Sequence, residues 1–264
     1  LSPWKNVTKI VNDKNLKTIN IAIVGKYVDL KDAYKSLDEA LVHGGIKNNV
    51  KIKIIRIESD KLKISEIRKK LIDASGILIP GGFGKRGTEG KIACINYARK
   101  NNIPFLGICF GMQMAVIEFA KNVLKIKKAG SSELDKKCFP VVGLIEEWSK
   151  NGKIVKGTST KLGGTMRLGV YPCQIAKGSL AGKLYGSDFV EERHRHRYEV
   201  NIAYQGKLEN AGLKMSGLSP DGLLPETVER PDHPWFVAVQ FHPEKSQKNG
   251  LLLIRDYFRS QNQK

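Results

Sequence analysis

The sequence lacks any apolar run approaching the roughly 18 residues that a membrane-spanning helix requires, and no signal-peptide pattern opens it. Its four cysteines are scattered without Cys-x-x-Cys spacing, which argues against a disulfide framework and against a zinc site. It also has no internal repeat and no linker rich in proline and serine. These absences predict a soluble, cytoplasmic, single-domain protein with free thiols and no membrane partner.

Acidic residues are few relative to basic ones, since 26 Asp and Glu residues stand against 45 Lys and Arg residues. The resulting formal charge of +19 is typical of proteins that bind phosphate backbones. Here the excess is mainly lysine, is spread along the whole chain and is not interleaved with aromatic residues on which bases could stack. We therefore expect no nucleic-acid partner and interpret the charge as a solvated surface. A basic face toward nucleotides or a partner domain is the alternative.

The first half of the chain alternates between two kinds of apolar pattern. Short apolar runs predict strands, and helically spaced apolar residues predict helices. The predicted strands cover residues 19–24, 50–57, 76–80 and 104–108, and the predicted helices cover residues 32–48, 60–72, 88–100 and 112–123. Four such alternations predict a parallel sheet with helices on both faces, whose functional groups gather at the carboxyl ends of the strands.

The second half contains shorter β-like stretches broken by glycine, which favour mixed or antiparallel additions to the sheet. These strands are predicted at residues 141–145, 164–170, 193–201, 213–217 and 236–241, followed by a helix at 250–260. The predicted fold class is α/β: a single domain with a mostly parallel central sheet flanked by helices, plus extra strands in the C-terminal half. Residues 1–17 are polar and are interpreted as a linker or an appended helix, which leaves residues 18–264 as the domain.

Cys109 lies in a turn between the predicted strand at 104–108 and the helix that follows it. Gly107 and Gly111 give it the spacing Gly-x-nucleophile-x-Gly, which lets the backbone bend sharply and exposes the central side chain. The unpaired N–H groups at the start of a helix favour an anion, and therefore a thiolate. The motif alone leaves two interpretations open: Cys109 is a catalytic nucleophile, or it is a buried structural cysteine.

A glycine-rich loop, Gly81-Gly82-Phe83-Gly84-Lys85-Arg86-Gly87, follows the predicted strand at 76–80. It contains a Gly-x-Gly-x-x-Gly pattern, but a dinucleotide site needs an acidic residue about 20 positions later, where this chain has Gly107-Ile108-Cys109. The loop is better suited to presenting backbone N–H groups beside Cys109, as an oxyanion hole requires.

His242 and Glu244 follow the last predicted strand and are joined by Pro243. In an extended segment alternate side chains point the same way, so the carboxylate could fix the tautomer of the imidazole while its other nitrogen reaches a nucleophile. Combined with the turn at Cys109, this pattern favours a Cys-His-Glu triad over a surface loop.

The segment Arg193-His194-Arg195-His196-Arg197 alternates two residue types over a predicted strand, which places the arginines on one face and the histidines on the other. The two histidines could bind a metal, but three flanking cations oppose a divalent ion and no further ligand follows at suitable spacing. We therefore expect no metal here, and expect an arginine directed at a carboxylate, because its planar fork suits bidentate binding.

Taken together, these segments resemble a known family. The triad residues, with PGGFGKRGTEGKI and GICFGMQ, are similar to the class I glutamine amidotransferases. The segments VGKYVDLKDAY, GGTMRLG, RHRHRYEVN and QFHPE are similar to the glutaminase domains of the CTP synthase branch of that family, over about residues 19–259. The resemblance implies hydrolysis of L-glutamine to glutamate and ammonia.

The resemblance also implies roles for individual residues. Cys109 would be the nucleophile, His242 the base and Glu244 its orienting partner, while Gly82 and the backbone of Phe110 would form the oxyanion hole. The other residues implied in glutamine binding are Gly111, Met112, Gln113, Glu133 and Arg197, with Glu133 facing the substrate ammonium and Arg197 its carboxylate. The chain departs from the family at Phe110, where leucine is usual, and mildly at Leu134, where phenylalanine is usual.

Because the chain begins at Leu1, we expect a piece of a longer protein in which a synthase domain precedes it. By resemblance, the full enzyme would use ATP and Mg²⁺ to aminate UTP to CTP, with GTP as an activator near residues 85–88, and would form a homotetramer. The domain itself is expected to need no cofactor. The alternatives are another class I glutaminase, a γ-glutamyl hydrolase and a non-catalytic basic binding module.

Overall fold

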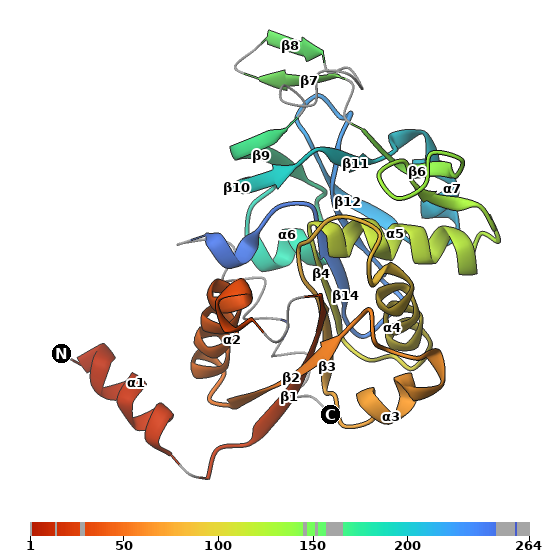
Figure 1. Ribbon diagram of the computed structural model, residues 1–264. Coiled ribbons are helices and arrows are strands. Elements are labelled where there is room, and N and C mark those ends of the chain that lie inside the picture. Colours follow the sequence, from red (N-terminus) through yellow and green to blue (C-terminus); the bar gives the residue numbers. More distant parts are fainter. Residues whose placement is uncertain are drawn as a thin grey trace.

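The computed structural model describes residues 2–13, 15–26, 30–144, 147–150, 153–156 and 166–246 together with Tyr257. In this part of the chain a nine-stranded sheet runs through the centre and helices cover both of its faces (Figure 1). Its strand order is β10-β9-β12-β13-β14-β4-β3-β1-β2.

One half of the sheet is parallel, in the order β14-β4-β3-β1-β2. Its strands are β1 (Thr18–Gly25), β2 (Lys51–Glu58), β3 (Gly76–Ile79), β4 (Phe105–Ile108) and β14 (Phe236–Val239). The connecting helices are α2 (Lys35–Lys47), α3 (Ile67–Leu71), α4 (Thr88–Lys100) and α5 (Phe110–Asn122), with 3₁₀ turns η1 (Lys31–Tyr34) and η2 (Ile64–Glu66) before α2 and α3. This arrangement brings the carboxyl ends of β3, β4 and β14 side by side.

The other half of the sheet is antiparallel and continues from β14. Its strands are β9 (Arg167–Ile175), β10 (Phe189–His196), β12 (Lys214–Leu218) and β13 (Pro225–Glu229). Helices α6 (Leu180–Tyr185) and α7 (Gln205–Asn210) and the turns η4 (Ile202–Tyr204) and η5 (Pro243–Lys245) lie along this half of the sequence. A small sheet, β11-β6-β5, combines Tyr198–Val200, Phe139–Leu144 and Ala129–Ser131, and the hairpin β7–β8 pairs Glu147–Lys150 with Lys153–Lys156.

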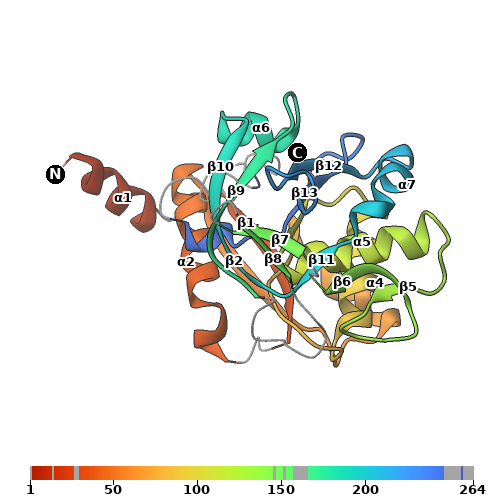
Figure 2. The ribbon, with the colours of Figure 1, turned by 90° about the horizontal axis from the view of Figure 1, so that it is seen from above.

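Two apolar cores form because successive residues of a strand face opposite sides of the sheet. Ala22 and Val24 of β1 face the side covered by α3, α4 and α5, whereas Ile21 and Ile23 face the side covered by α2 and α6. Helix α1 (Ser2–Asn12) projects away from this body (Figures 1 and 2). No helix among the described residues is both long and apolar enough to cross a bilayer.

Most of the predicted elements are confirmed. The strands at 19–24, 50–57, 76–80 and 104–108 appear as β1, β2, β3 and β4, with β2 at an edge of the sheet, and the helix at 88–100 has the predicted bounds. The C-terminal strands are mixed additions, as expected: β9, β10, β12 and β13 pair antiparallel, whereas β14 pairs parallel with β4. The strand predicted at 141–145 forms β6, which belongs to the separate small sheet. The predicted helix at 250–260 lies outside the described residues apart from Tyr257, and residues 163–165 of the GGTMRLG segment also lie outside them.

The predicted helix at 60–72 is wrong in its first half, because only η2 and α3 form there. The preceding segment is held against the start of α4, where a Cβ on Gly90 would lie 2.1 Å from the carbonyl oxygen of Ser59. Arg86 also forms an ion pair with Asp60 at 3.2 Å. These long-range contacts override the local helical pattern.

Gly111 offers a test of how closely α5 packs on β3. A Cβ at this position would lie 2.1 Å from the backbone carbonyl oxygen of Ile79, which cannot move aside as a side chain would. We expect Gly111→Ala to lower the free energy of unfolding by about 1–3 kcal/mol, measured by chemical denaturation. Gly206→Ala in α7 is the matched control, because no atom lies within 4 Å of its new Cβ. Equal midpoints for the two variants would contradict the tight contact.

Candidate active site

Cys109 occupies the sharp turn that the sequence predicts between β4 and α5. Its backbone is at φ 53° and ψ −104°, a conformation that a residue with a side chain rarely adopts and that is characteristic of strained functional positions. The turn is anchored because the backbone N–H of Cys109 donates to the carbonyl of Val239 at the end of β14, at 2.7 Å. The nucleophile candidate is therefore tied directly to the strand that leads to His242.

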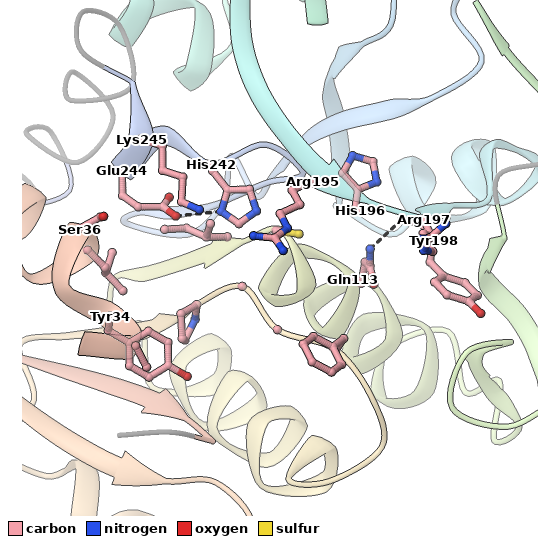
Figure 3. Close-up of a pocket in the computed structure, with 18 of the residues that line it drawn as sticks. Tyr34, Ser36, Gln113, Arg195, His196, Arg197, Tyr198, His242, Glu244 and Lys245 are labelled. Carbon is pink, nitrogen blue, oxygen red and sulfur yellow. Dashed lines mark hydrogen bonds and ion pairs between the residues drawn. The ribbon is translucent and has the colours of Figure 1, made fainter. Parts of the chain in front are cut away.

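His242 and Glu244 meet as predicted, although the local geometry differs from the prediction. Nδ1 of His242 lies 2.8 Å from Oε1 of Glu244, and the two side chains point at each other in Figure 3. The expectation of an extended segment is wrong, because Pro243 starts the 3₁₀ turn η5 and the carboxylate reaches the ring from within that turn. The backbone N–H of His242 also donates to the carbonyl of Arg193 in β10, at 2.8 Å.

The charge state of His242 is set by competing effects. Burial favours the neutral ring, but hydrogen bonds with Cys109 and Glu244 and the charges of both partners outweigh it and raise the pKa of His242 to about 10. Because Nδ1 is held by Glu244, Nε2 is the nitrogen available to the thiol. The arrangement thus favours an imidazolium beside a thiolate, with the carboxylate orienting the ring.

The glycine-rich loop after β3 lies against this triad. A Cβ on Gly81 would lie 2.9 Å from Cε1 of His242 and 3.7 Å from Cβ of Cys109, so only glycine fits there. The loop is fixed from two sides: the N–H of Gly84 donates to Oε1 of Glu133 at 2.7 Å, and the ammonium of Lys26 donates to the carbonyls of Phe83 and Gly84. The loop is therefore fixed next to Cys109 and His242, where the oxyanion-hole hypothesis places its backbone N–H groups.

Phe110 is buried, and its ring packs among cations. The ammonium of Lys91 lies 5.2 Å from the ring centroid and that of Lys26 lies 5.9 Å from it. Burial lowers the pKa of Lys91 to about 8, and the face of the aromatic ring compensates part of that loss of hydration. The ring points into the core, which leaves the backbone of Phe110 as its contribution at the turn.

A cavity of about 740 Å³ opens over Cys109, a size typical of small-molecule sites. Of the predicted glutamine-binding residues, four line it: Gly82, Gln113, Glu133 and Arg197. Tyr34 and Ser36 line its far end (Figure 3). Burial raises the pKa of Glu133, while the N–H of Gly84 and the charge of Lys26 oppose that shift.

Gly111 and Met112, which were also predicted to bind glutamine, do not line this cavity, and neither does Phe110. The side chain of Met112 is fully buried in the core beneath α5, and Gly111 packs on the backbone of Ile79. Gln113 is committed to the protein, since its amide nitrogen donates to the carbonyl of Tyr198 at 2.8 Å and to Oε1 of Gln240 at 3.3 Å.

The alternation predicted for residues 193–197 is confirmed as far as His196, with Arg193 and Arg195 exposed and His194 and His196 buried, whereas Arg197 lies beyond the strand. The single strand predicted at 193–201 is wrong, because it breaks at Arg197 into β10 and β11, which belong to different sheets. The break turns Arg197 and Tyr198 to the cavity. Among the described residues, no group of three or more His, Cys, Asp and Glu side chains has a metal-binding arrangement.

Sequence reasoning missed several polar residues at the site. Gln240 is fully buried and directs Nε2 at Sγ of Cys109, 3.7 Å away. Arg167 and Glu226 lie beneath the cavity as a buried ion pair. No periodic pattern marks such residues, because their partners are far away in the sequence.

This fold and this site define a class of glutamine-hydrolysing domains, and the chain belongs to the class I glutamine amidotransferase family, whose description "Glutamine amidotransferase class-I" matches residues 29–259. Its curated relatives include CTP synthases. That of Pelagibacter ubique is 64% identical over 244 residues, which cover 92% of this chain and 45% of the relative. That of Gluconobacter oxydans is 53% identical over 246 residues, with the same two coverages of 92% and 45%.

Among solved structures, the glutaminase domain of Trypanosoma brucei CTPS with bound acivicin superposes with a TM-score of 0.83 at 36% sequence identity. The match covers 93% of this chain and 94% of that one, so the two domains share their whole architecture. The chain spans about 45% of the length of the curated relatives, so it corresponds to one part of a longer enzyme in those organisms.

Glu244 should control the reactivity of Cys109. Glu244→Gln removes one of the two charges that hold His242 as an imidazolium, which weakens its ion pair with the thiolate. We expect alkylation of Cys109 by iodoacetamide at neutral pH to slow by about tenfold, the effect of one pKa unit, with peptide mapping as the measurement. Glu191→Gln, on the exposed face of β10, is the control. An unchanged rate in Glu244→Gln would remove Glu244 from the triad.

Proposed function

We propose that this chain hydrolyses L-glutamine to glutamate and ammonia, and that it is the glutaminase part of a CTP synthase. The observation that carries the proposal is the contact of Cys109, His242 and Glu244 at a strained strand-to-helix turn beside the glycine-rich loop. The architectural match to the acivicin-bound glutaminase domain supports it.

The first half of the reaction forms a thioester. The thiolate of Cys109 attacks the side-chain amide carbon of glutamine, and two backbone N–H groups, at Gly82 and Phe110, stabilise the developing oxyanion, each by roughly 3–4 kcal/mol. The imidazolium of His242 then gives its proton to the leaving nitrogen, so ammonia departs and a γ-glutamyl thioester remains. Glu244 holds the ring in the orientation that both transfers need.

The second half releases glutamate. Neutral His242 removes a proton from water, the resulting hydroxide adds to the thioester, and collapse of the intermediate expels the thiolate. General acid and base catalysis of this kind contributes about 10²- to 10⁴-fold in rate. Glu133 and Arg197 both line the cavity and carry opposite charges. Glu133 can pair with the ammonium of the substrate and Arg197 with its carboxylate.

The ammonia would serve a second site in the full protein. The curated relatives are about twice as long as this chain, which supports a preceding synthase domain, with residues 1–17 as the connector. That domain would use ATP and Mg²⁺ to aminate UTP, with GTP as an activator in a homotetramer. The triad and the cavity also fit a γ-glutamyl hydrolase, and the relatives named CTP synthase favour the amidotransferase.

Cys109→Ala should abolish glutamine hydrolysis, because Cys109 carries the only thiol among the described residues that line the cavity. Glutamate release from glutamine is the measurement, and we expect a loss of at least about 10³-fold in kcat. Cys138→Ala, at a half-buried cysteine away from the cavity, is the control and should retain activity. Ammonia release by Cys109→Ala at the wild-type rate would refute the nucleophile.

Arg197→Ala should weaken substrate binding more than chemistry, because the guanidinium would contact the carboxylate of glutamine and not the reacting amide. We expect the KM for glutamine to rise by about tenfold or more, as the loss of a charge-assisted pair predicts, with a smaller change in kcat. Arg193→Ala, exposed on the preceding strand β10 and outside the cavity, is the control. An unchanged KM would exclude Arg197 from the binding site.

A further inference from the structure

A buried cluster of five ionisable side chains lies beneath the cavity and takes no part in the reaction steps above. Four strands contribute to it, and each member is at most 7% exposed: Arg167 in β9, His194 and His196 in β10, Glu199 in β11 and Glu226 in β13. We call it the Arg167 cluster. Arg167 bridges the two carboxylates, with Nη1 2.9 Å from Oε1 of Glu199 and 2.7 Å from Oε1 of Glu226.

The two histidines form a second connection between the same carboxylates. Nε2 of His194 faces Oε2 of Glu226 at 3.5 Å, Nδ1 of His194 lies 2.9 Å from Nε2 of His196, and Nδ1 of His196 faces Oε1 of Glu199 at 3.5 Å. The chain Glu226–His194–His196–Glu199 therefore contains three gaps, and each gap joins two atoms that repel unless a proton lies between them.

Counting protons shows that neutral histidines are not enough. Two neutral imidazoles carry one N–H proton each and can fill two of the three gaps, whichever tautomers they adopt. A third proton is needed, on a carboxyl group or on a ring. The net charge also calls for one additional proton. Arg167 with two ionised carboxylates has a charge of −1, and one added proton makes the buried cluster neutral. A low-dielectric site strongly favours the neutral form.

The surroundings place that proton at the carboxyl ends. Burial, together with the charge of Arg167, lowers the pKa values of His194 and His196. Burial raises the pKa of Glu226 to about 7, and it also raises the pKa of Glu199. Outside the strands of the cluster, His242 acts on both histidines and Asp221 acts on Glu226. Within those strands, Cys173 of β9 interacts with Arg167 and Glu226, the Tyr171 ring of β9 stacks on Arg167, and the backbone of Tyr198 in β11 contacts His196.

The cluster is linked to the cavity through short backbone paths. Arg197 and Tyr198 lie between two cluster members, His196 and Glu199, and the carbonyl of Tyr198 accepts the hydrogen bond of Gln113. The carbonyl of Glu226 accepts the backbone N–H of Gln240, which directs its side chain at Cys109. A change of charge in the cluster would therefore shift the segment that carries Arg197.

We infer that the Arg167 cluster stores one proton shared between Glu199 and Glu226, and that this proton positions Arg197 for binding the carboxylate of glutamine. The inference rests on the proposed function for its effect on substrate, but not for the proton itself. Loss of the proton at high pH leaves a buried negative charge in the cluster and shifts the segment that carries Arg197. The KM for glutamine should therefore rise with pH.

The test uses glutamine variants in the full-length protein that contains this chain. Glu199→Gln and Glu226→Gln each replace the stored proton by an amide N–H, and each leaves Arg167 paired with one carboxylate. Both should keep the KM within about twofold of wild type at about pH 6 and lose the wild-type increase, about tenfold, between about pH 6 and about pH 9. The double variant leaves Arg167 without a counter-charge and should raise the KM at least about tenfold at every pH.

Glu191→Gln, on the exposed face of β10, is the matched control and should follow the wild-type profile. If each single variant raised the KM as much as the double variant, both carboxylates would be ionised and the inference would fail.

Infrared spectroscopy tests the proton without any activity. Wild type should show the C=O stretch of a buried, protonated carboxyl group that disappears at high pH and is absent from the double variant, even where that variant is less stable. Absence of this band in the wild type at about pH 6 would overturn the inference. Presence of the band in a protein that does not hydrolyse glutamine would support the stored proton and refute the proposed function instead.

Discussion

The hydrogen bond from the backbone of Cys109 to the carbonyl of Val239 determines where everything else in the site lies. It joins a residue at φ 53° to the carboxyl end of β14, three residues before His242. Such a conformation costs of order 1–3 kcal/mol and persists only where the surrounding structure enforces it. Here the enforcement comes from β4, β14 and the contact of Gly111 with Ile79, which together hold the thiol at the edge where parallel strands end.

The antiparallel half of the sheet supplies what the parallel half cannot. The parallel strands present the thiol, the glycine-rich loop and, after β14, the imidazole, whereas the arginines of the cavity lie at the end of β10 and directly after it. Between these strands lies a layer of buried charge, which would be expensive without partners. Arg167 pairs with both of its carboxylates, and Glu229 accepts the first N–H groups of α6, from Leu180 at 2.9 Å and from Ala181 at 3.2 Å. The buried charges of this half are therefore paired, and one of them, Glu199, lies two residues after Arg197.

The sequence was sufficient to predict elements whose signals are local. Helix α4 begins after Gly87, which adopts the left-handed conformation at φ 74°, and its apolar spacing marks its length. The pairing of His242 with Glu244 was also predictable, because two residues of separation keep them close in either an extended segment or a 3₁₀ turn. Strand β13 was not predictable, since its sequence PETVE is charged and yet entirely buried. Its Glu226 is intelligible only with Arg167, 59 residues earlier.

Labelling by a glutamine-mimicking diazo-ketone tests the central claim most directly, because the reagent needs the substrate pocket and the nucleophile together. Intact-mass spectrometry and peptide mapping of the treated protein should show a single adduct on Cys109 that excess glutamine prevents. That result would establish a preformed glutaminase site in this chain. A folded protein that forms no adduct, or one labelled equally well in the presence of glutamine, would contradict the account.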